Sequence, residues 1–264
     1  ITGLIPAVFS VRAGISQALQ EPGRSSTAVR MPAKHALAGL QMSLATALAI
    51  CAALLGQSLA RLQSVPLGFT DPEHLLTASI TRSVHSEAAH KENLAFYWRA
   101  LDEIRAIPGV VSAGMSSQVP FGEGNTTMTL GPIPRPPGVP AQGVRASWRI
   151  VTADYLETMR VRVVQGRLFD ERVDPPLGML VSEGLARRLW PDGRNPVGTR
   201  TWSSNGQVFT VLGVVADVRQ TSLKEDPNPT IYLSPKWYLW PTMMLVVRTH
   251  GDPAAFAGPI RDAV

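Results

Sequence analysis

The longest feature of the hydrophobic pattern is an uncharged stretch from Ala36 to Ala60. As a helix it rises about 1.5 Å per residue and spans about 37 Å, which is enough to cross a bilayer core of about 30 Å. We therefore expect a transmembrane helix over residues 35–61. A buried helix of a soluble protein is the alternative. A cleaved signal peptide fits less well, because its apolar region is only about 7–15 residues long.

Beyond this stretch the pattern predicts alternating strands and helices. Residues 75–81 and 110–115 are typical of strands, and residues 88–107 between them are typical of an amphipathic helix, which makes a β-α-β unit. The apolar face of this helix carries Leu94, Tyr97, Leu101 and Ile104. A strand at 243–248, followed by a helix that opens at Asp252-Pro253, indicates another step of the same layer, with its next strand missing.

The middle of the chain differs in composition and in its predicted elements. Residues 120–143 are rich in Pro and Gly and predict turns and edge structure. Short helices near 152–159 and 182–190 follow, together with a strand at 208–215 that is apolar enough to be buried on both faces. We therefore expect an α+β fold in which a mostly-β lobe, about 145–235, is inserted into the β-α-β lobe.

Residues 1–34 precede the predicted span. Residues 1–20 are typical of the tail of another membrane helix and continue into an amphipathic stretch, in which Val11, Ile15 and Leu19 share one helical face. That face could lie on lipid or dock on a cytoplasmic partner, and periodicity does not separate the two. The apolar opening, and a chain that closes within a predicted helix, predict an internal piece of a longer protein, truncated at its C-terminus.

The charge distribution predicts the orientation of the span. The net charge is +5 and the pI is about 9.8, yet residues 1–61 hold five basic side chains and one acidic one. This excess flanks the membrane segment, which argues against nucleic-acid binding by the large domain. Arg24, Arg30 and Lys34 precede the span, whereas Asp71 and Glu73 are the first charges beyond Arg61, which places the N-terminal side in the cytoplasm.

The sequence lacks the motifs of a catalytic or metal site. It has no Gly-rich phosphate-binding loop that ends in Lys and Ser/Thr, and no Gly-x-Ser-x-Gly elbow. The histidines lack zinc-ligand spacing, and a single cysteine, Cys51, rules out an intrachain disulfide. Trp237, Tyr238 and Trp240 favour core packing of a loop over a contact with a membrane or a partner.

Several short motifs, in order along residues 58–219, resemble the MacB-like and FtsX-like ABC transporter permeases, in particular the duplicated orphan permeases. They include the span exit from Ser58 to Phe69, Tyr155-Leu156-Glu157-Thr158-Met159, Gly166-Arg167-Leu168-Phe169, Ala186-Arg187-Arg188-Leu189-Trp190-Pro191, Asn195-Pro196-Val197-Gly198, and the run from Val211 to Arg219. Leu4-Ile5-Pro6-Ala7 and the amphipathic stretch are similar to the end of a preceding permease half.

The resemblance implies a domain plan. Residues 1–34 would end a preceding permease half and form a cytoplasmic linker, 35–61 would span the inner membrane, and 62–264 would form a MacB-like periplasmic core domain with a porter-like lobe. The motif residues would then be structural: Gly166, Arg167, Phe169, Trp190, Pro191, Asn195, Pro196, Gly198, Gly213 and Asp217. The glycines would permit tight turns or close backbone approach, and Arg167 and Asp217 would fix the geometry between strands.

The resemblance also implies a function. The chain would be a non-catalytic permease subunit that couples ATP hydrolysis on a separate cytoplasmic ABC ATPase to movement of the outer domain, in export or envelope remodelling. It would bind no cofactor itself, and its partners would be membrane lipid, the ATPase subunit and the remaining helices of the parent chain. The alternative is a single-pass, membrane-anchored sensor or ligand-binding module.

Overall fold

The computed structural model describes residues 27–63, 65–83, 86–122, 124–134, 143–170, 173–175, 177–238 and 240–264. The chain divides into two compact units, Ile1–Gln63 and Ser64–Val264, and each is described by itself. The predicted coupling residues Val11, Ile15 and Leu19 lie outside the described residues.

The first unit contains a single described helix, α2 (Thr27–Gln63). Its segment His35–Leu62 reaches a mean hydropathy of 1.8 with no residue buried, and in the described part of the chain no other helix is long and apolar enough to span a membrane. The hydroxyls of Ser43 and Thr46 donate to the carbonyls four residues back, both at 2.8 Å, so they are satisfied without water. By length and composition α2 is therefore a candidate membrane helix, as predicted.

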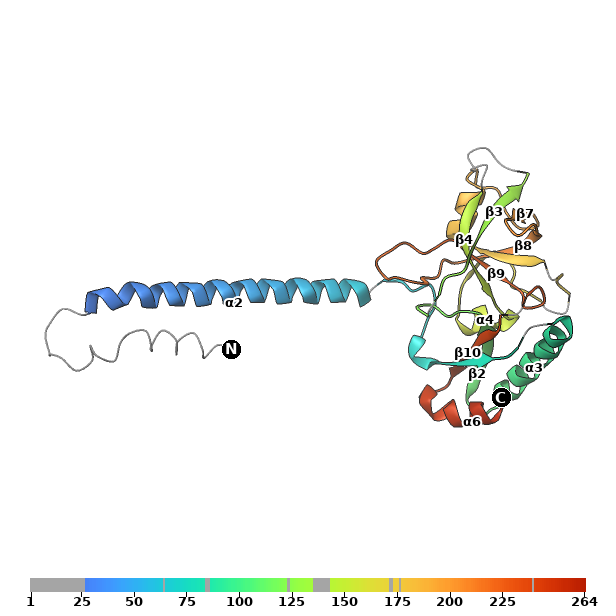
Figure 1. Cartoon of the computed structure of the whole chain (residues 1–264), viewed down its shortest axis with the longest axis horizontal. Helices are drawn as coiled ribbons and strands as arrows, with labels where there is room; N and C mark the ends of the chain where they lie inside the picture. Colours follow the sequence, from blue (N-terminus) through green and yellow to red (C-terminus); the bar gives the residue numbers. More distant parts are fainter. Residues whose placement is uncertain are drawn as a thin grey trace. The chain divides into compact units, whose positions relative to one another are not determined.

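A three-stranded sheet with one covering helix forms the smaller part of the second unit (Figure 1). Its elements in chain order are β1 (Leu75–Thr81), α3 (Glu87–Arg105), β2 (Val110–Ser116) and β10 (Thr242–Thr249). β10 lies between β1 and β2 and is antiparallel to both, so β1 and β2 are parallel to each other. The predicted β-α-β unit is present, but β10 separates its two strands.

Local chemistry explains where α3 begins and which face it buries. The Ser86 side chain accepts a hydrogen bond from the Ala89 amide at 3.1 Å and caps the first turn. Tyr97, Leu101 and Ile104, which the sequence placed on one apolar face, are buried beneath the helix. The 3.6-residue period therefore identified both the helix and its buried side.

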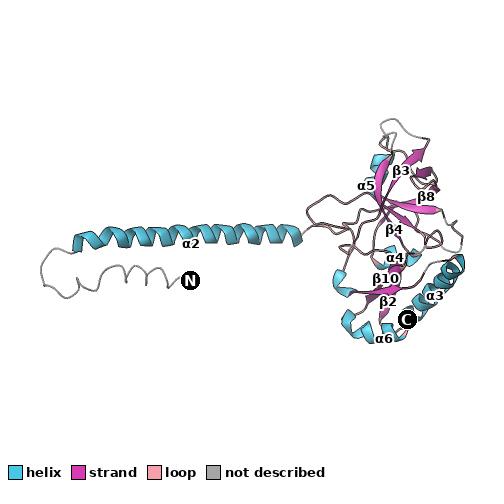
Figure 2. Cartoon of the chain, viewed as in Figure 1, coloured by secondary structure: helices cyan, strands magenta, loops and turns pink. Residues whose placement is uncertain are grey.

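A seven-stranded sheet forms the larger part of the unit (Figure 2). Its strands are β3 (Thr127–Ile133), β4 (Val144–Ile150), β5 (Val163–Gly166), β6 (Gly178–Ser182), β7 (Arg200–Ser203), β8 (Val208–Val215) and β9 (Thr230–Leu233), in the order β5-β8-β6-β9-β4-β3-β7. Because β7 also pairs with β8, the sheet closes on itself as a small barrel, which removes most free edges.

Strand β3 differs from the sequence expectation of turns and edge structure over residues 120–143. It pairs with β4 on one side and β7 on the other, so it is an interior strand. Gly131 explains how it fits: a Cβ there would lie 2.3 Å from Nε1 of Trp202, so only glycine leaves room for this indole. The packing of an aromatic ring from another strand, not local propensity, sets this segment.

The strands of the barrel lie in the chain between β2 and β10. They begin at Thr127, before the start near residue 145 that we expected for an inserted lobe, because β3 belongs to the same sheet. β8 has the predicted bounds, but its first half alternates between buried and half-buried residues and only Gly213–Val215 form a continuous buried run. The expectation of burial on both faces therefore holds for its end alone.

Shorter helices complete the unit: η2 (Pro72–His74), α4 (Ala153–Thr158), α5 (Glu183–Leu189), η3 (Pro253–Phe256) and α6 (Ala257–Asp262). The Asp252 carboxylate accepts from the Ala254 amide at 2.9 Å, which confirms the predicted cap, although the first turn is 3-10. Trp237 and Trp240 pack edge-to-face on the buried Trp148 and extend the barrel core, as predicted. Tyr238, the third residue of that prediction, also contacts Trp148 but is 42% exposed.

Candidate functional site: the segment that leads into the folded domain

Residues 66–71, here called the lead-in segment, connect the end of α2 to η2. Its carbonyl at Leu67 accepts a hydrogen bond from the Arg219 amide at 3.0 Å, in the stretch that follows β8. Gly68 has φ of 88°, and a Cβ there would lie 2.2 Å from the Asp217 carbonyl oxygen and 2.8 Å from Cα of Val218. Only glycine permits this close backbone approach, which fixes the lead-in segment to the barrel.

A buried arginine ties the same segment to the three-stranded sheet. Arg248, near the end of β10, is only 2% exposed. Its Nη2 donates to the Thr70 carbonyl at 2.8 Å, its Nη1 to the Asp71 carbonyl at 3.1 Å and its Nε to the Thr158 carbonyl at 2.8 Å. One planar guanidinium therefore holds the lead-in segment, β10 and the end of α4 together.

Charges around this guanidinium act in opposite directions. Burial lowers the pKa of Arg248, and the nearby positive charge of Arg160 lowers it further, whereas Asp71 and Glu73 raise it. Asp71 forms an ion pair with Arg160 and approaches Nη1 of Arg248 at 4.0 Å. A single carboxylate is thus shared by two guanidinium groups.

The backbone at this ion pair is unusual. Among the described non-glycine residues only three have positive φ, and two of them, Asp71 at 52° and Arg160 at 54°, are paired with each other. Asp tolerates this region better than most residues, but Arg does not favour it, and such conformations cost roughly 1–3 kcal/mol each unless the surroundings hold them. The bond from Arg248 to the Asp71 carbonyl and the bond from the Arg160 amide to the Glu157 carbonyl, at 2.8 Å, restrain the backbone at the two residues.

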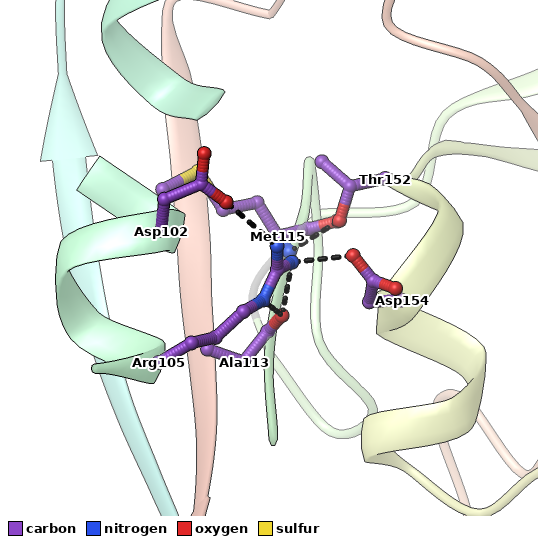
Figure 3. Close-up of polar contacts among 6 residues, drawn as sticks. All are labelled: Asp102, Arg105, Ala113, Met115, Thr152 and Asp154. Carbon is purple, nitrogen blue, oxygen red and sulfur yellow. Dashed lines mark hydrogen bonds and ion pairs between the residues drawn. The ribbon is translucent and has the colours of Figure 1, made fainter. Parts of the chain in front are cut away.

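A second set of contacts clamps the two sheets together (Figure 3). Arg105, in the last turn of α3, donates to the Ala113 carbonyl through Nη2 at 2.8 Å and Nε at 3.2 Å, and pairs with Asp154 of α4. On the same side, the amide of Met115 donates to Oγ1 of Thr152 at 2.9 Å, and the amide of Thr152 donates to the Met115 carbonyl at 2.9 Å. The start of α4 is therefore attached to β2.

Gly114 of β2 makes this attachment sterically feasible. A Cβ at this position would lie 2.5 Å from Cα and 2.6 Å from the amide nitrogen of Tyr155, so α4 rests directly on the strand backbone. An isolated bridge between Ser116 and Val151 continues the contact to the end of β4. The two sheets of the second unit thus share hydrogen bonds as well as apolar packing.

These geometric features can be compared with known proteins. Residues 36–263 match the family described as the MacB-like periplasmic core domain. The chain belongs to this family. A comparison with curated proteins found no match. The chain therefore carries the MacB-like periplasmic core domain of an ABC transporter permease, preceded by a candidate membrane helix.

Solved structures with similarity to this MacB-like chain include two outer domains of transporters. One is the periplasmic region of MacB from Actinobacillus actinomycetemcomitans, with 13% identity, 76% of this chain and 86% of that chain covered, and a TM-score of 0.48. The other is the extracellular domain of the noncanonic ABC-type transporter YknZ from Gram-positive bacteria, with 15% identity, 62% and 75% covered, and a TM-score of 0.42. The family assignment rests on the match over residues 36–263.

Within the MacB-like domain, the motif glycines lie at close backbone approaches or turns. Gly166 of β5 and Gly213 of β8 are register partners. A Cβ at Gly166 would lie 2.4 Å from the Leu212 carbonyl oxygen, and one at Gly213 would lie 2.4 Å from the Arg167 carbonyl oxygen. Gly198 has φ of 82°, and its amide donates to Val211 at 2.8 Å. Gly166 and Gly213 thus lie where two backbones approach closely, and Gly198 has a positive φ; the structural role that the resemblance implied for these glycines stays a prediction.

The motif residues Arg167 and Asp217 are not brought together. The Arg167 guanidinium pairs with Asp174 in the connection to β6. Asp217 accepts from the Gly184 amide at 2.8 Å and from Nη2 of Arg187 at 3.1 Å, at the first turn of α5. That each residue fixes the geometry between strands remains a prediction, because their side chains contact a connection and a helix start.

The remaining motif residues are distributed over the barrel rather than gathered in a site. Phe169 and Trp190 are buried, at 7% and 3% exposure, whereas Pro191 is exposed. Asn195 accepts from the Val197 amide at 3.0 Å, and the carbonyl of the buried Pro196 accepts from the amide and the hydroxyl of Thr199. Their contacts stabilise the α5–β7 connection of the MacB-like domain. No group of three or more metal-binding side chains occurs in the residues that the structure describes.

The sequence reasoning missed the residues that hold the lead-in segment. The sequence places Arg248 at the end of a predicted strand. It places Gly68 in the motif at the exit of the span, and Asp71 among the first charges that follow the span. The available signal was a single arginine at the end of an otherwise apolar strand, since a charge there needs buried partners. Its partners Thr70 and Thr158 are distant from it in sequence, and the Tyr155–Met159 motif that contains Thr158 does not indicate a contact with Arg248.

The clamp should make a small, measurable contribution to stability. Arg105 and Asp154 are 31% and 44% exposed, so their ion pair itself contributes about 0.5–1 kcal/mol after solvent screening. We expect Arg105→Met to cost about 1–2 kcal/mol, because the bonds to Ala113 are also lost. A double-mutant cycle with Asp154→Ala, measured by urea denaturation of the full chain in micelles, should give a coupling of about 0.5 kcal/mol or more. A coupling of zero would contradict the contact.

The Arg167–Asp174 pair predicts a pH dependence. The hydrogen bond from Arg167 lowers the pKa of Asp174 below its usual range. Because the folded-state pKa is the lower one, the stabilisation is present above the unfolded-state pKa and is lost as the pH falls through the folded-state value. Arg167→Met should therefore lower Tm at pH 7, with the difference from the native chain shrinking toward pH 2. The exposed Arg188→Met is the control, and an equal Tm difference at both pH values would contradict the prediction.

Proposed function

We propose that this chain is the non-catalytic permease part of an ABC transporter, and that ATP hydrolysis on a separate cytoplasmic subunit moves its periplasmic domain through the lead-in segment. The observation that supports this is the double attachment of that segment. Leu67 is bonded to the chain that follows β8, and Thr70 and Asp71 are bonded to Arg248 of β10. A displacement of the segment would be passed to both sheets together.

The clamp between the sheets supports the same proposal. A domain that transmits movement must keep its two sheets fixed relative to each other. Here α4 is hydrogen-bonded to β2 by backbone as well as side-chain groups. The remaining membrane helices of the parent chain and the cytoplasmic ATPase complete the transporter. Export or envelope remodelling is the expected outcome of the movement.

Hydrogen exchange in the assembled transporter tests the coupling. The full-length parent should co-purify with an ABC ATPase subunit, and exchange of the amides at 67–75 should change when ATP replaces ADP. A catalytically inactive ATPase that still binds ATP separates binding from hydrolysis. The proposal would be contradicted if the parent associated with no ATPase, or if hydrogen exchange in the lead-in segment were the same with ATP and ADP. Either result would favour a ligand-binding module.

Cysteine labelling tests the proposed orientation, with the N-terminal side in the cytoplasm. In a Cys51→Ser background, Asn205→Cys at the exposed β7–β8 turn and Glu103→Cys on α3 should react with an impermeant maleimide in cells whose outer membrane is permeabilised. Ser25→Cys, before the apolar helix, should react only after lysis. The reverse pattern would overturn the periplasmic placement in this protein.

A further inference from the structure

A small pocket adjoins the junction at Asp71. It has a volume of about 170 Å³ and opens to solvent. Its walls come from the Asp71–His74 stretch, from β2, from the Arg160 turn and from the end of β10, and they are lined by Asp71, His74, Val111, Arg160, Arg248, Thr249, His250 and Gly251. Four segments far apart in the sequence therefore converge on one cavity.

The lining of this pocket carries two positive side chains and one negative side chain. Two guanidinium groups, Arg160 and Arg248, face a single lining carboxylate, Asp71, and the two imidazoles of His74 and His250 add further nitrogen atoms. The carboxylate of Glu73, outside the lining, lies 3.8 Å from Nδ1 of His74. The guanidinium of Arg248 already donates hydrogen bonds to backbone carbonyl oxygens. The side chain of Arg160 is half exposed and donates to Asp71 through one nitrogen. Arg160 and the imidazoles are thus placed to bind an additional anion.

Size and charge together select the class of ligand. The volume corresponds to roughly six water molecules at about 30 Å³ each, which suits a phosphate-sized group and is well below the pocket of about 300 Å³ or more that a drug-sized ligand needs. A metal ion is disfavoured, because two arginines line the cavity and no metal-binding cluster exists among the described residues. We propose that this pocket binds a phosphate group through Arg160, His250 and His74.

Such a ligand would stabilise the junction. It would give Arg160 a second anionic partner besides Asp71, and so relieve the sharing of one carboxylate by two guanidinium groups. The phosphate could be free in solution or belong to a lipid headgroup, because the same donors recognise both. This inference does not depend on the coupling to an ATPase.

Binding can be measured with inorganic phosphate as the probe. We expect phosphate to raise the Tm of the full chain in maltoside micelles saturably, and to perturb the His250 and His74 imidazole signals in NMR spectra. Arg160→Asn, which removes the charge but keeps a residue that accepts positive φ, and His250→Gln should each weaken binding about tenfold or more. Arg99→Gln, on the exposed face of α3, should bind as the native chain does.

Nanodiscs distinguish the source of the phosphate. If lipid supplies it, phosphatidylglycerol nanodiscs should shift the His250 signal, phosphate-free glycolipid nanodiscs should not, and Arg160→Asn should abolish the shift. If the anion is free, added phosphate should shift the signal equally in both. No response to phosphate or to phosphatidylglycerol, or variants that respond as strongly as the native chain, would overturn the proposal.

Discussion

Replacing Gly114 by alanine should destabilise the periplasmic domain by about 2–3 kcal/mol, although the change adds one methyl group. The added Cβ would lie 2.5 Å from Cα of Tyr155, and a backbone atom cannot rotate away as the end of a side chain can. Either α4 must lift from β2 or the strand must shift, and both break the bonds between Met115 and Thr152. Overpacking of this kind costs about 1–3 kcal/mol.

Thermal unfolding of the full chain in micelles measures this effect. For a domain of this size the expected loss corresponds to a fall in Tm of about 4–12 °C. Gly258→Ala in α6 is the matched control, because a Cβ there meets nothing within 4 Å. A Gly114→Ala variant as stable as the Gly258→Ala variant would show that α4 does not rest on β2 in solution.

Replacing Arg248 by methionine should cost about 3–5 kcal/mol and release the lead-in segment. Three carbonyl oxygens, at Thr70, Asp71 and Thr158, would each lose the donor that a 2% exposed guanidinium supplies. Methionine replaces the buried apolar stem but none of the hydrogen bonds. Arg248→Lys should recover less than half of the loss, because an ammonium cannot reproduce the planar fork.

Hydrogen exchange under native conditions locates this loss. Amides at 67–75 should exchange much faster in Arg248→Met, while those of β6 and β9 in the barrel should change less. Arg99→Met on the exposed face of α3 controls for removal of a positive charge. Equal acceleration throughout the domain would mean that Arg248 stabilises the fold generally and does not specifically hold the lead-in segment.

Periodic features of the fold were accessible from the sequence. A short stretch of sequence is enough to show the spacing of apolar residues. That spacing predicts the apolar helix, the buried face of α3 and the bounds of β1 and β8. Strand β3 was missed because Gly131 and Pro132 oppose strand formation locally, and only the ring of Trp202 on a neighbouring strand makes them suitable. Tertiary packing overrode local propensity there.

The candidate site was harder to predict than the fold. Gly68 and Asp217 both stand in motifs of the family resemblance, yet nothing in either motif indicates that the two backbones touch. Arg248 and the lead-in segment lie at opposite ends of the domain sequence. Two of the hydrogen bonds between them join residues 177 and 178 positions apart. Contacts this distant leave no local pattern.

The position of β10 between β1 and β2 also constrains the order in which the domain can mature. Among the described strands β1 pairs with β10 alone, and the hydroxyl contact between Thr81 and Thr242 joins residues 161 apart. During synthesis β1 therefore has no strand partner until nearly all of the domain has been made, and loop closure over that distance is slow. The lead-in segment acquires its Arg248 bonds at the same late moment, so before β10 is in place the segment can be held only through its contacts with residues 217–219.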